Sequence, residues 1–397
     1  MTRPPEKYLK HTPFYPRAAA ASRTNRWHQW KAYTVADSFI DVELEYFAIR
    51  NQAAVFDLTP MSKYRVTGPD AMAYFDRIFT RDVSKLAVGR VGYGVWCDGG
   101  GRVIDDGTLF RLGENEYRLC SQERQLDWLN WSKLGFDVEV VEETDDVAAL
   151  ALQGPCSCKI LKNMGLDGVE SLKPFGITRF DFDGTELMIS RTGFTGDLGY
   201  ELWIDPEHAL ALWDALFEAG EHLHVVPMGG DALEIARIEA GFILGEADFV
   251  PATESIRPGR SRSPFELGLD WLVDFRKPHF NGRRALLQER EKGSRYRLVK
   301  LDIEGNKTAC DSYIYRGKGA RKKVVGTVTS ATWSPSLKAN IALASLELPS
   351  GASDEDLYAE IYYSRELRWN RIMAACRVVD GPFFDPPRRR QTPAPDY

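Results

Sequence analysis

One local pattern occurs twice in the 397-residue sequence and limits the folds that the chain can adopt. In each copy a strand-like run is followed by Gly-Pro and then by a helix-like run, over residues 63–75 and again over residues 149–161. Glycine permits the positive φ angle of a tight turn, and proline fits the first turn of a helix. Gly154 follows Gly68 by 86 positions. Two such units predict an internal duplication in a chain of mixed helices and strands.

The segments around these copies favour an α+β fold. Apolar periodicity predicts helices over residues 42–53 and 122–134. Short apolar runs bounded by turn residues predict strands, and these lie at residues 54–57, 93–97, 103–104, 107–112 and 117–120. We therefore expect residues 37–287 to form two interleaved α+β subdomains that together make one catalytic region.

The two ends of the chain carry different patterns. Residues 1–36 are rich in proline, alanine and aromatic side chains without a period, which predicts an irregular aromatic arm laid over the surface. A charged linker is expected at residues 288–297, and the short apolar runs of residues 295–390 are typical of a small β-barrel domain. The arginines at 388–390 and the tail at residues 391–397 are expected to be mobile.

Composition and charge exclude several classes of protein. The sequence has 51 Lys and Arg against 57 Asp and Glu, a net charge of −6, which argues against nucleic acid or a membrane as a partner of the whole chain. No apolar run approaches the ~18 residues of a membrane span, and the polar N-terminus has no apolar signal core. We therefore expect a cytoplasmic protein. His222 and His224 lack further ligands nearby and more readily end a surface helix, so no metal site is expected.

Familiar motifs for hydrolases, phosphate loops and dinucleotide binding are absent from the sequence, and carboxylates in apolar surroundings remain as candidates. Asp105 and Asp106 follow an apolar pair. On a strand they face opposite sides, so one can point into a cleft, and the alternative is a pair that caps a turn.

A second candidate is the glycine-spaced segment 191–202, in which Glu201 begins an apolar strand. Its glycines would let a flat ligand approach the backbone closely. A buried acid needs a partner, such as the two parallel N–H donors on the edge of a pterin ring; a plain hairpin is the alternative. In the following helix, Arg237 either pairs on the surface with an acid one turn away or turns inward to bind a ligand carboxylate or to hold the carboxylate site in place.

Five ordered motifs resemble those of the aminomethyltransferase family, which comprises the glycine cleavage T-protein and tetrahydrofolate-dependent demethylases such as dimethylsulfoniopropionate demethylase. They lie at residues 56–61, 100–106, 191–201, 237–241 and 280–286, and residues 325–335 resemble the strand and turn of the family's C-terminal barrel. The resemblance implies a three-lobed α+β architecture with tetrahydrofolate in a central channel and a C-terminal β-barrel.

The same resemblance implies roles for individual residues. Asp106 matches the acid near the reactive folate nitrogens and is the expected catalytic residue. Glu201 matches the acid that binds the pterin edge, and Arg237 matches the arginine of the folate site. The resemblance also implies apolar and aromatic channel positions: Met61, Tyr93 and Phe194.

The sequence departs from the glycine cleavage proteins on the substrate side. Residues 59–61 are Thr-Pro-Met where those proteins usually have Ser-His-Met, and Phe194 replaces a tyrosine. We therefore expect an enzyme that moves a methyl group from a small methylated donor, favouring a sulfonium or ammonium compound, to N5 of tetrahydrofolate. Aromatic faces attract such cations, and the candidate substrate-binding rings are Trp27, Trp30, Tyr33 and Trp96. The alternatives are an aminomethyltransferase acting with a lipoyl carrier protein and a non-catalytic folate-binding regulatory protein.

Overall fold

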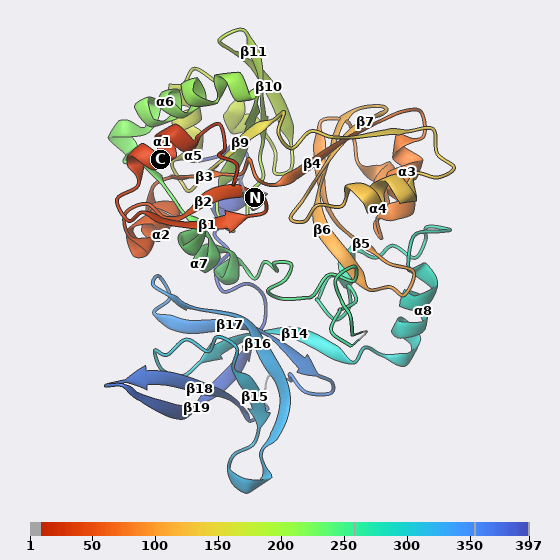
Figure 1. Cartoon of the computed structure of the whole chain (residues 1–397), viewed down its shortest axis with the longest axis vertical. Helices are drawn as coiled ribbons and strands as arrows, with labels where there is room; N and C mark the ends of the chain where they lie inside the picture. Colours follow the sequence, from red (N-terminus) through yellow and green to blue (C-terminus); the bar gives the residue numbers. More distant parts are fainter. Residues whose placement is uncertain (1–8, 258, 353–354, 396–397) are drawn as a thin grey trace, which may run out of the picture.

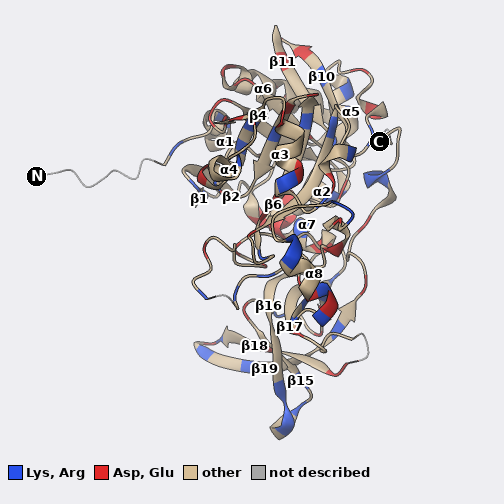
Figure 2. Cartoon of the chain, turned by 90° about the vertical axis from the view of Figure 1, so that its right-hand side faces the viewer, with Lys and Arg blue, Asp and Glu red and all other residues tan. Residues whose placement is uncertain are grey.

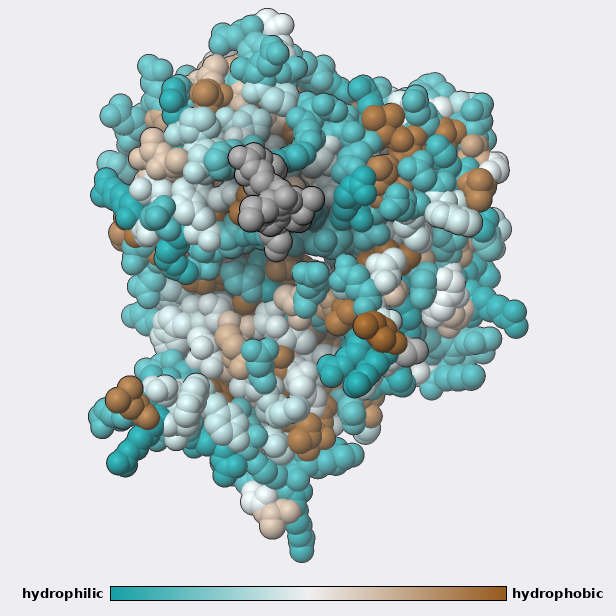
Figure 3. Space-filling model, viewed as in Figure 1, coloured by the Kyte–Doolittle hydropathy of each residue, from teal (hydrophilic) through white to brown (hydrophobic). Residues whose placement is uncertain are grey.

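Three lobes meet around a common centre in the computed structural model, which describes residues 9–257, 259–352 and 355–395 (Figure 1). Two lobes are built on open sheets and the third is a closed barrel. Seen from the side of Figure 1, the surface is mainly hydrophilic and is hollowed between the sheet lobes and the barrel (Figure 3). The arrangement confirms the expected three-lobed α+β architecture with a barrel domain. Among the described residues, no helix combines the length and apolar character needed to cross a lipid bilayer.

The first lobe contains a six-stranded sheet in the order β10-β11-β12-β9-β3-β13. Its strands are β3 (Ala54–Asp57), β9 (Ala148–Gln153), β10 (Ile177–Phe182), β11 (Thr185–Ser190), β12 (Gly199–Ile204) and β13 (Val226–Pro227). Its main helices are α2 (Val42–Asn51), α5 (Ser157–Asn163), α6 (Ala209–Gly220) and α7 (Gly230–Ala240). Alternate residues of β9 point to opposite faces: Leu150 and Leu152 pack with α5 and α6, whereas Ala149 and Ala151 pack with α2 and α7.

The second lobe contains a five-stranded sheet in the order β5-β6-β7-β4-β8. Its elements are β4 (Ser62–Thr67), α3 (Ala71–Ile78), β5 (Arg90–Cys97), β6 (Val103–Gly113), β7 (Glu116–Ser121), α4 (Leu126–Ser132) and β8 (Glu139–Glu142). Phe110 and Cys120 of this sheet share one apolar cluster with Met188 and Trp203 of the first sheet. The rings of Phe110 and Trp203 are 5.2 Å apart, so the two sheets meet through their side chains at the centre of the molecule.

The third lobe is a closed barrel in the order β14-β17-β16-β15-β18-β19. Its strands are β14 (Tyr296–Ile303), β15 (Tyr313–Arg316), β16 (Lys323–Ser334), β17 (Ala339–Glu347), β18 (Leu357–Arg365) and β19 (Arg368–Val379). A charged linker was expected before the barrel at residues 288–297, but residues 288–292 form the end of helix α8 (Arg283–Lys292). Leu286 of this helix packs against the turn of residues 98–101. Helices α7 and α8 lie between the sheet lobes and the barrel (Figure 2).

Both strand–Gly-Pro–helix units adopt the predicted structure. Gly68 joins β4 to α3 with a φ of 136°, and Gly154 joins β9 to α5 with a φ of 127°. A Cβ at Gly68 would lie 2.3 Å from the carbonyl oxygen of Asp137, and a Cβ at Gly154 would lie 2.6 Å from that of Gln52. Glycine is therefore required at both positions for the same reason.

The helix predicted over residues 122–134 is shorter in the structure, where α4 covers Leu126–Ser132.

The N-terminal arm is more regular than its sequence indicates. It contains α1 (Tyr15–Ala21) and an antiparallel hairpin of β1 (Arg26–Trp30) and β2 (Tyr33–Ser38), whereas residues 1–8 of the arm lie outside the described residues. Phe14 is fully buried in the core of the first lobe, which fixes α1 there. The expectation of an irregular arm was wrong because this burial depends on residues far away in the sequence.

The C-terminal tail is also held in place where it is described. The side chain of Arg388 forms an ion pair with Asp197, and the backbone N–H of Ala394 donates to the carbonyl of Glu170 at 2.7 Å. Ala394 is buried. The expected mobile tail is therefore a packed segment up to residue 395, and residues 396–397 lie outside the described residues.

We predict that Gly154→Ala lowers the free energy of unfolding by about 2–4 kcal/mol, because it combines a positive φ with a methyl group pressed against backbone carbonyls. Gly99→Ala is the control, since its added methyl group meets nothing within 4 Å. The control should change stability by less than about 0.5 kcal/mol. Urea unfolding of both variants gives the measurement, and equal losses of stability would contradict the explanation.

Candidate functional site

Asp106 lies on β6 opposite strand β5, which carries Tyr93. The phenol O–H of Tyr93 donates to the Asp106 carboxylate at 2.8 Å. Loss of water around Asp106 raises its pKa to about 6, the Tyr93 hydrogen bond lowers it, and the charge of Asp248 raises it. A carboxyl group with a pKa near 6 has both protonation states available close to neutral pH, as a group that transfers protons requires.

Asp105 is directed to the other side of β6, as the strand pattern predicts. It is 1% exposed and accepts hydrogen bonds from the backbone N–H groups of Asp106 and Glu123. Burial and the neighbouring Asp106 raise its pKa well above the ordinary value. Asp105 thus holds the end of β7 against β6, and Asp106 is the member of the pair that is available for chemistry.

Glu201 lies in the middle of β12 and is buried. The hydroxyl of Thr192 donates to its Oε2 at 2.5 Å and that of Ser190 to the same oxygen at 3.4 Å. Among the described residues, no protein hydrogen bond to Oε1 occurs. Burial raises the pKa of Glu201 to about 7, although both hydroxyls lower it. A buried carboxylate with one oxygen unpaired fits a flat ligand that presents N–H donors, such as the pterin of tetrahydrofolate.

The glycines before Glu201 serve packing inside the protein. A Cβ at Gly193 or Gly199 would lie 2.0 or 2.2 Å from Oε1 of Gln153, and one at Gly196 would lie 2.5 Å from the Cβ of Ala240. The amide of Gln153 donates to the backbone carbonyls of Thr192 and Tyr200. The expectation that these glycines let a flat ligand approach the backbone was wrong, because Gln153 and α7 occupy that space.

Arg237 is fully buried and uses all five of its N–H donors within the protein. It donates to both carboxylate oxygens of Glu234, to Asp248 at 2.6 Å, to the hydroxyl of Ser330 at 2.7 Å and to the carbonyl of Phe242. In this arrangement it has no donor left for a ligand. Arg237 instead joins α7 to the barrel and positions Asp248, whose charge acts on Asp106.

The two other residues assigned to the channel are partly exposed. The ring of Phe194 stacks on that of Phe242 with the centroids 5.6 Å apart. Met61 packs at the edge of the central apolar cluster beside β4. Both therefore have surface that a ligand can contact, and their role in folate binding stays a prediction.

Two of the four candidate substrate rings are committed to the protein interior. Trp96 is fully buried and packs on Phe79, with the ring centroids 5.3 Å apart. Tyr33 is 5% exposed and its hydroxyl donates to Asp145. Trp96 is therefore removed from the substrate-site assignment, and Tyr33 anchors the arm.

The other two rings lie on strand β1 of the arm. Trp27 packs against Phe39 and donates its indole N–H to Asn25, so it also anchors the arm. Trp30 packs on Phe56, with the ring centroids 6.2 Å apart, and its buried indole N–H has no partner. Trp30 is thus the member of the set whose ring is partly exposed and whose donor is unused.

Lys31, which lies at the turn of the arm hairpin, was not predicted from the sequence. Its ammonium donates to the hydroxyl of Ser62 at 2.8 Å, and burial lowers its pKa to about 8 despite the nearby carboxylates of Glu123 and Asp105. A signal for this residue was missing because its neighbours become close only when the hairpin folds over β4 and β7.

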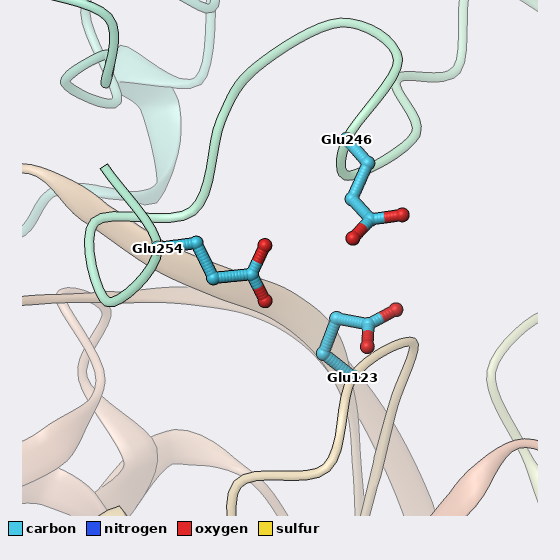
Figure 4. Close-up of side chains that lie close together, drawn as sticks. All are labelled: Glu123, Glu246 and Glu254. Atoms are coloured by element: carbon cyan, nitrogen blue, oxygen red, sulfur yellow. The ribbon is translucent and has the colours of Figure 1, made fainter. Parts of the chain in front are cut away.

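Three further acids also escaped sequence reasoning because they are far apart in the chain. The carboxylates of Glu123, Glu246 and Glu254 converge from three loops, with oxygen atoms within 4.8 Å of one another (Figure 4). Burial and the repulsion from Glu246 raise the pKa of Glu254, and burial raises the pKa of Glu123. Through the backbone N–H of Glu123, this group adjoins Asp105, on the side of β6 opposite Asp106.

Comparisons with known proteins agree with the three-lobed fold. A family model described as the GCVT N-terminal domain matches residues 14–277, and one described as the glycine cleavage T-protein C-terminal barrel domain matches residues 297–385. A solved structure, the glycine cleavage system aminomethyltransferase T from Bartonella henselae, has the same fold, with a TM-score of 0.82 and 24% identity over 95% of this chain and 98% of that one.

Relatives identified by sequence carry two kinds of name. The aminomethyltransferase of Halothermothrix orenii is 34% identical over 88% of this chain and 95% of its own length, and that of Symbiobacterium thermophilum is 32% identical over 96% and 99%. The trimethylamine-oxide aldolase of Ruegeria pomeroyi is 38% identical over 77% of this chain but only 38% of its own length.

We predict that Glu201→Gln stabilises the ligand-free protein at pH 8 by up to about 3 kcal/mol. The folded-state pKa of about 7 exceeds the ordinary value of 4.5. Between these values the unfolded chain releases the proton and the folded chain keeps it, so stability falls as pH rises through this window. Thermal unfolding at pH 8 and pH 4.5 tests this, because the advantage of the variant should disappear at pH 4.5. An equal advantage at both values would contradict the explanation.

Proposed function

Because the chain belongs to the glycine cleavage T-protein family, whose enzymes use tetrahydrofolate as a co-substrate, we propose that it transfers a methyl group from a small sulfonium or ammonium donor to N5 of tetrahydrofolate. In this proposal Glu201 binds the pterin edge and Asp106 is the catalytic acid–base. Met61, Tyr93 and Phe194 border the bound folate, and Arg237 acts indirectly by positioning Asp248.

The acidic surroundings of Asp106 support a cationic donor. The charge of Asp248 acts on Asp106, and Asp105 is its neighbour along β6. The three-glutamate group adjoins Asp105 on the other side of this strand. The ammonium of Lys31 interacts electrostatically with Glu123 and Asp105. Opposite charges attract strongly where water is scarce, so an excess of carboxylates stabilises a positively charged donor more than a neutral one. Trp30 adds an aromatic face of the kind that cations contact.

The chemistry divides the work between the ligands and the chain. Tetrahydrofolate supplies, when bound, the nitrogen lone pair that accepts the one-carbon unit. The electron pair of the broken donor bond leaves with the sulfide or amine, which departs neutral. Asp106 can receive the proton that leaves the acceptor nitrogen, since its pKa is about 6. Orientation of two bound ligands is then the main contribution of the protein.

A second function has specific support. Relatives matched over nearly their whole length are named aminomethyltransferases, which favours an aminomethyl donor carried by a lipoyl protein. In contrast, the relative named trimethylamine-oxide aldolase carries a trimethylated nitrogen compound in its name, and that favours a small methylated donor. A folate-binding regulatory protein without turnover is the third possibility.

Product analysis separates the three functions. The pure protein is incubated with tetrahydrofolate and a panel of methylated sulfonium and ammonium compounds, or with an aminomethylated lipoyl carrier protein. We expect 5-methyltetrahydrofolate from at least one small donor. Formation of 5,10-methylenetetrahydrofolate from the carrier alone would assign the aminomethyltransferase function, and folate binding without any product would leave the regulatory one.

We further predict that Asp106→Asn lowers kcat by about 10²–10⁴-fold, because the proton acceptor is lost. The affinity for tetrahydrofolate, measured by calorimetry, should stay within about twofold, since the amide keeps the shape and a hydrogen bond to Tyr93. Glu186→Gln serves as the control because that residue pairs with Arg179 on an outer strand. Full activity of the Asp106→Asn variant would refute the assignment.

A further inference from the structure

The final described segment returns from the barrel to the first lobe (Figure 1). This segment, residues 384–395, is called the C-terminal strap here. It begins where the backbone N–H of Phe384 donates to the carbonyl of Glu239 on α7, and it crosses the loop of residues 191–199. That loop leads directly into β12 and Glu201.

We propose that the C-terminal strap is a working part of the folate site and that Arg388 is a positioning residue for it. The strap holds loop 191–199 in the one conformation that presents Glu201 and its hydroxyl partner to the pterin. This inference rests on the proposed folate site at Glu201, but it adds a segment for which the sequence motifs imply no role.

The contact between Arg388 and Asp197 fixes the middle of the loop. Nε of Arg388 donates to Oδ1 of Asp197 at 2.6 Å and Nη2 donates to Oδ2 at 2.8 Å, in a two-pronged arrangement. The Asp197 side chain is 0% exposed, and Arg50 approaches it only at 3.4 Å. Paired hydrogen bonds of this kind specify geometry as well as attraction. Without Arg388, the buried carboxylate of Asp197 would lose its two short arginine hydrogen bonds and keep the more distant one from Arg50, which favours rearrangement of the loop.

A second arginine, Arg191, fixes the start of the loop by donating from the loop to the strap, whereas Arg388 donates from the strap to the loop. Arg191 belongs to the loop and reaches into the strap, where it donates to the carbonyl of Gln391 at 2.6 Å and to the hydroxyl of Thr392 at 3.0 Å. Arg191 is 4% exposed. The loop and the strap therefore clasp each other with one arginine from each side.

The clasp is close in the chain to the groups that would contact the ligand. Thr192, which follows Arg191, donates its hydroxyl to Glu201 at 2.5 Å. Phe194 stacks on Phe242, and Arg389 of the strap lies over the same Phe242 ring, 5.0 Å from its centroid. A loop ordered before binding does not lose conformational freedom when the ligand arrives, so the strap should contribute to affinity.

The test uses the full-length protein and tetrahydrofolate itself. Arg388→Ala should weaken tetrahydrofolate binding by about tenfold in calorimetry, the scale on which supporting residues act on a binding site. Backbone amide exchange should become faster over residues 192–199 and stay unchanged in the barrel. Arg388→Lys keeps the charge but loses the paired hydrogen bonds, so the affinity of this variant for tetrahydrofolate should lie between those of the unaltered protein and Arg388→Ala. Arg390→Ala is the matched control, because Arg390 pairs with Asp385 inside the strap. This variant should bind tetrahydrofolate with unchanged affinity.

The outcomes separate this proposal from the folate site on which it rests. Unchanged affinity in both Arg388 variants overturns the role of the strap and leaves the site at Glu201 intact. Faster exchange throughout the first lobe, with the same loss in Arg390→Ala, also overturns it, because that result describes general destabilisation. If the unaltered protein takes up no tetrahydrofolate, the folate site is wrong and the proposal falls with it.

Discussion

Charge removed from water at the junction of the lobes is the constraint on which the rest of the structure depends. Buried carboxylates there fall into two groups. Asp248, Glu239 and Asp197 each form an ion pair with an arginine. Glu201 and Asp106 face hydroxyl groups instead, and their pKa values rise to about 7 and about 6. The first group joins elements together, and the second remains available for ligands and protons.

The paired acids explain how separate lobes keep one geometry. Arg50 of α2 contacts Glu239 of α7 at 2.6 Å, and Glu239 also accepts hydrogen bonds from Tyr46 and from Ser334 of the barrel. Arg237 connects the same helix to a second barrel residue. Breaking one partner of such a buried pair costs about 3–5 kcal/mol. Helix α7 therefore acts as the common support of the first lobe and the barrel, and the loop bearing Asp248 is placed by it.

Sequence patterns predicted local structure well and distant pairing poorly. The Gly-Pro units, the barrel strands and the acids Asp106 and Glu201 all follow from short motifs, because a turn or a buried strand leaves a local signature. Arg388 and Asp197 are 191 positions apart, and neither has a local feature that identifies the other. The same reason explains the arm: burial of Phe14 and insertion of Lys31 exist only once β4, β7 and α6 are in place. Arg237 was assigned to the folate site, but two of its five donors go to Glu234 on its own helix and three go to groups outside α7, which the local sequence does not show.

The two unpaired acids also link ligand binding to protonation. Their raised pKa values come mainly from lost hydration, so the ionised forms are short of partners rather than forbidden. In the proposed site, N–H donors of the pterin against Oε1 of Glu201 would stabilise its charged form, and a cationic donor near Asp106 would do the same there. Each proposed ligand would then lower the pKa of the acid that it contacts, and near neutral pH its binding would release a fraction of a proton. Burial of Glu201 and Asp106 without an arginine thus costs stability in the ligand-free protein. If the proposed ligands supply the missing partners, the free energy lost in this way contributes to their binding.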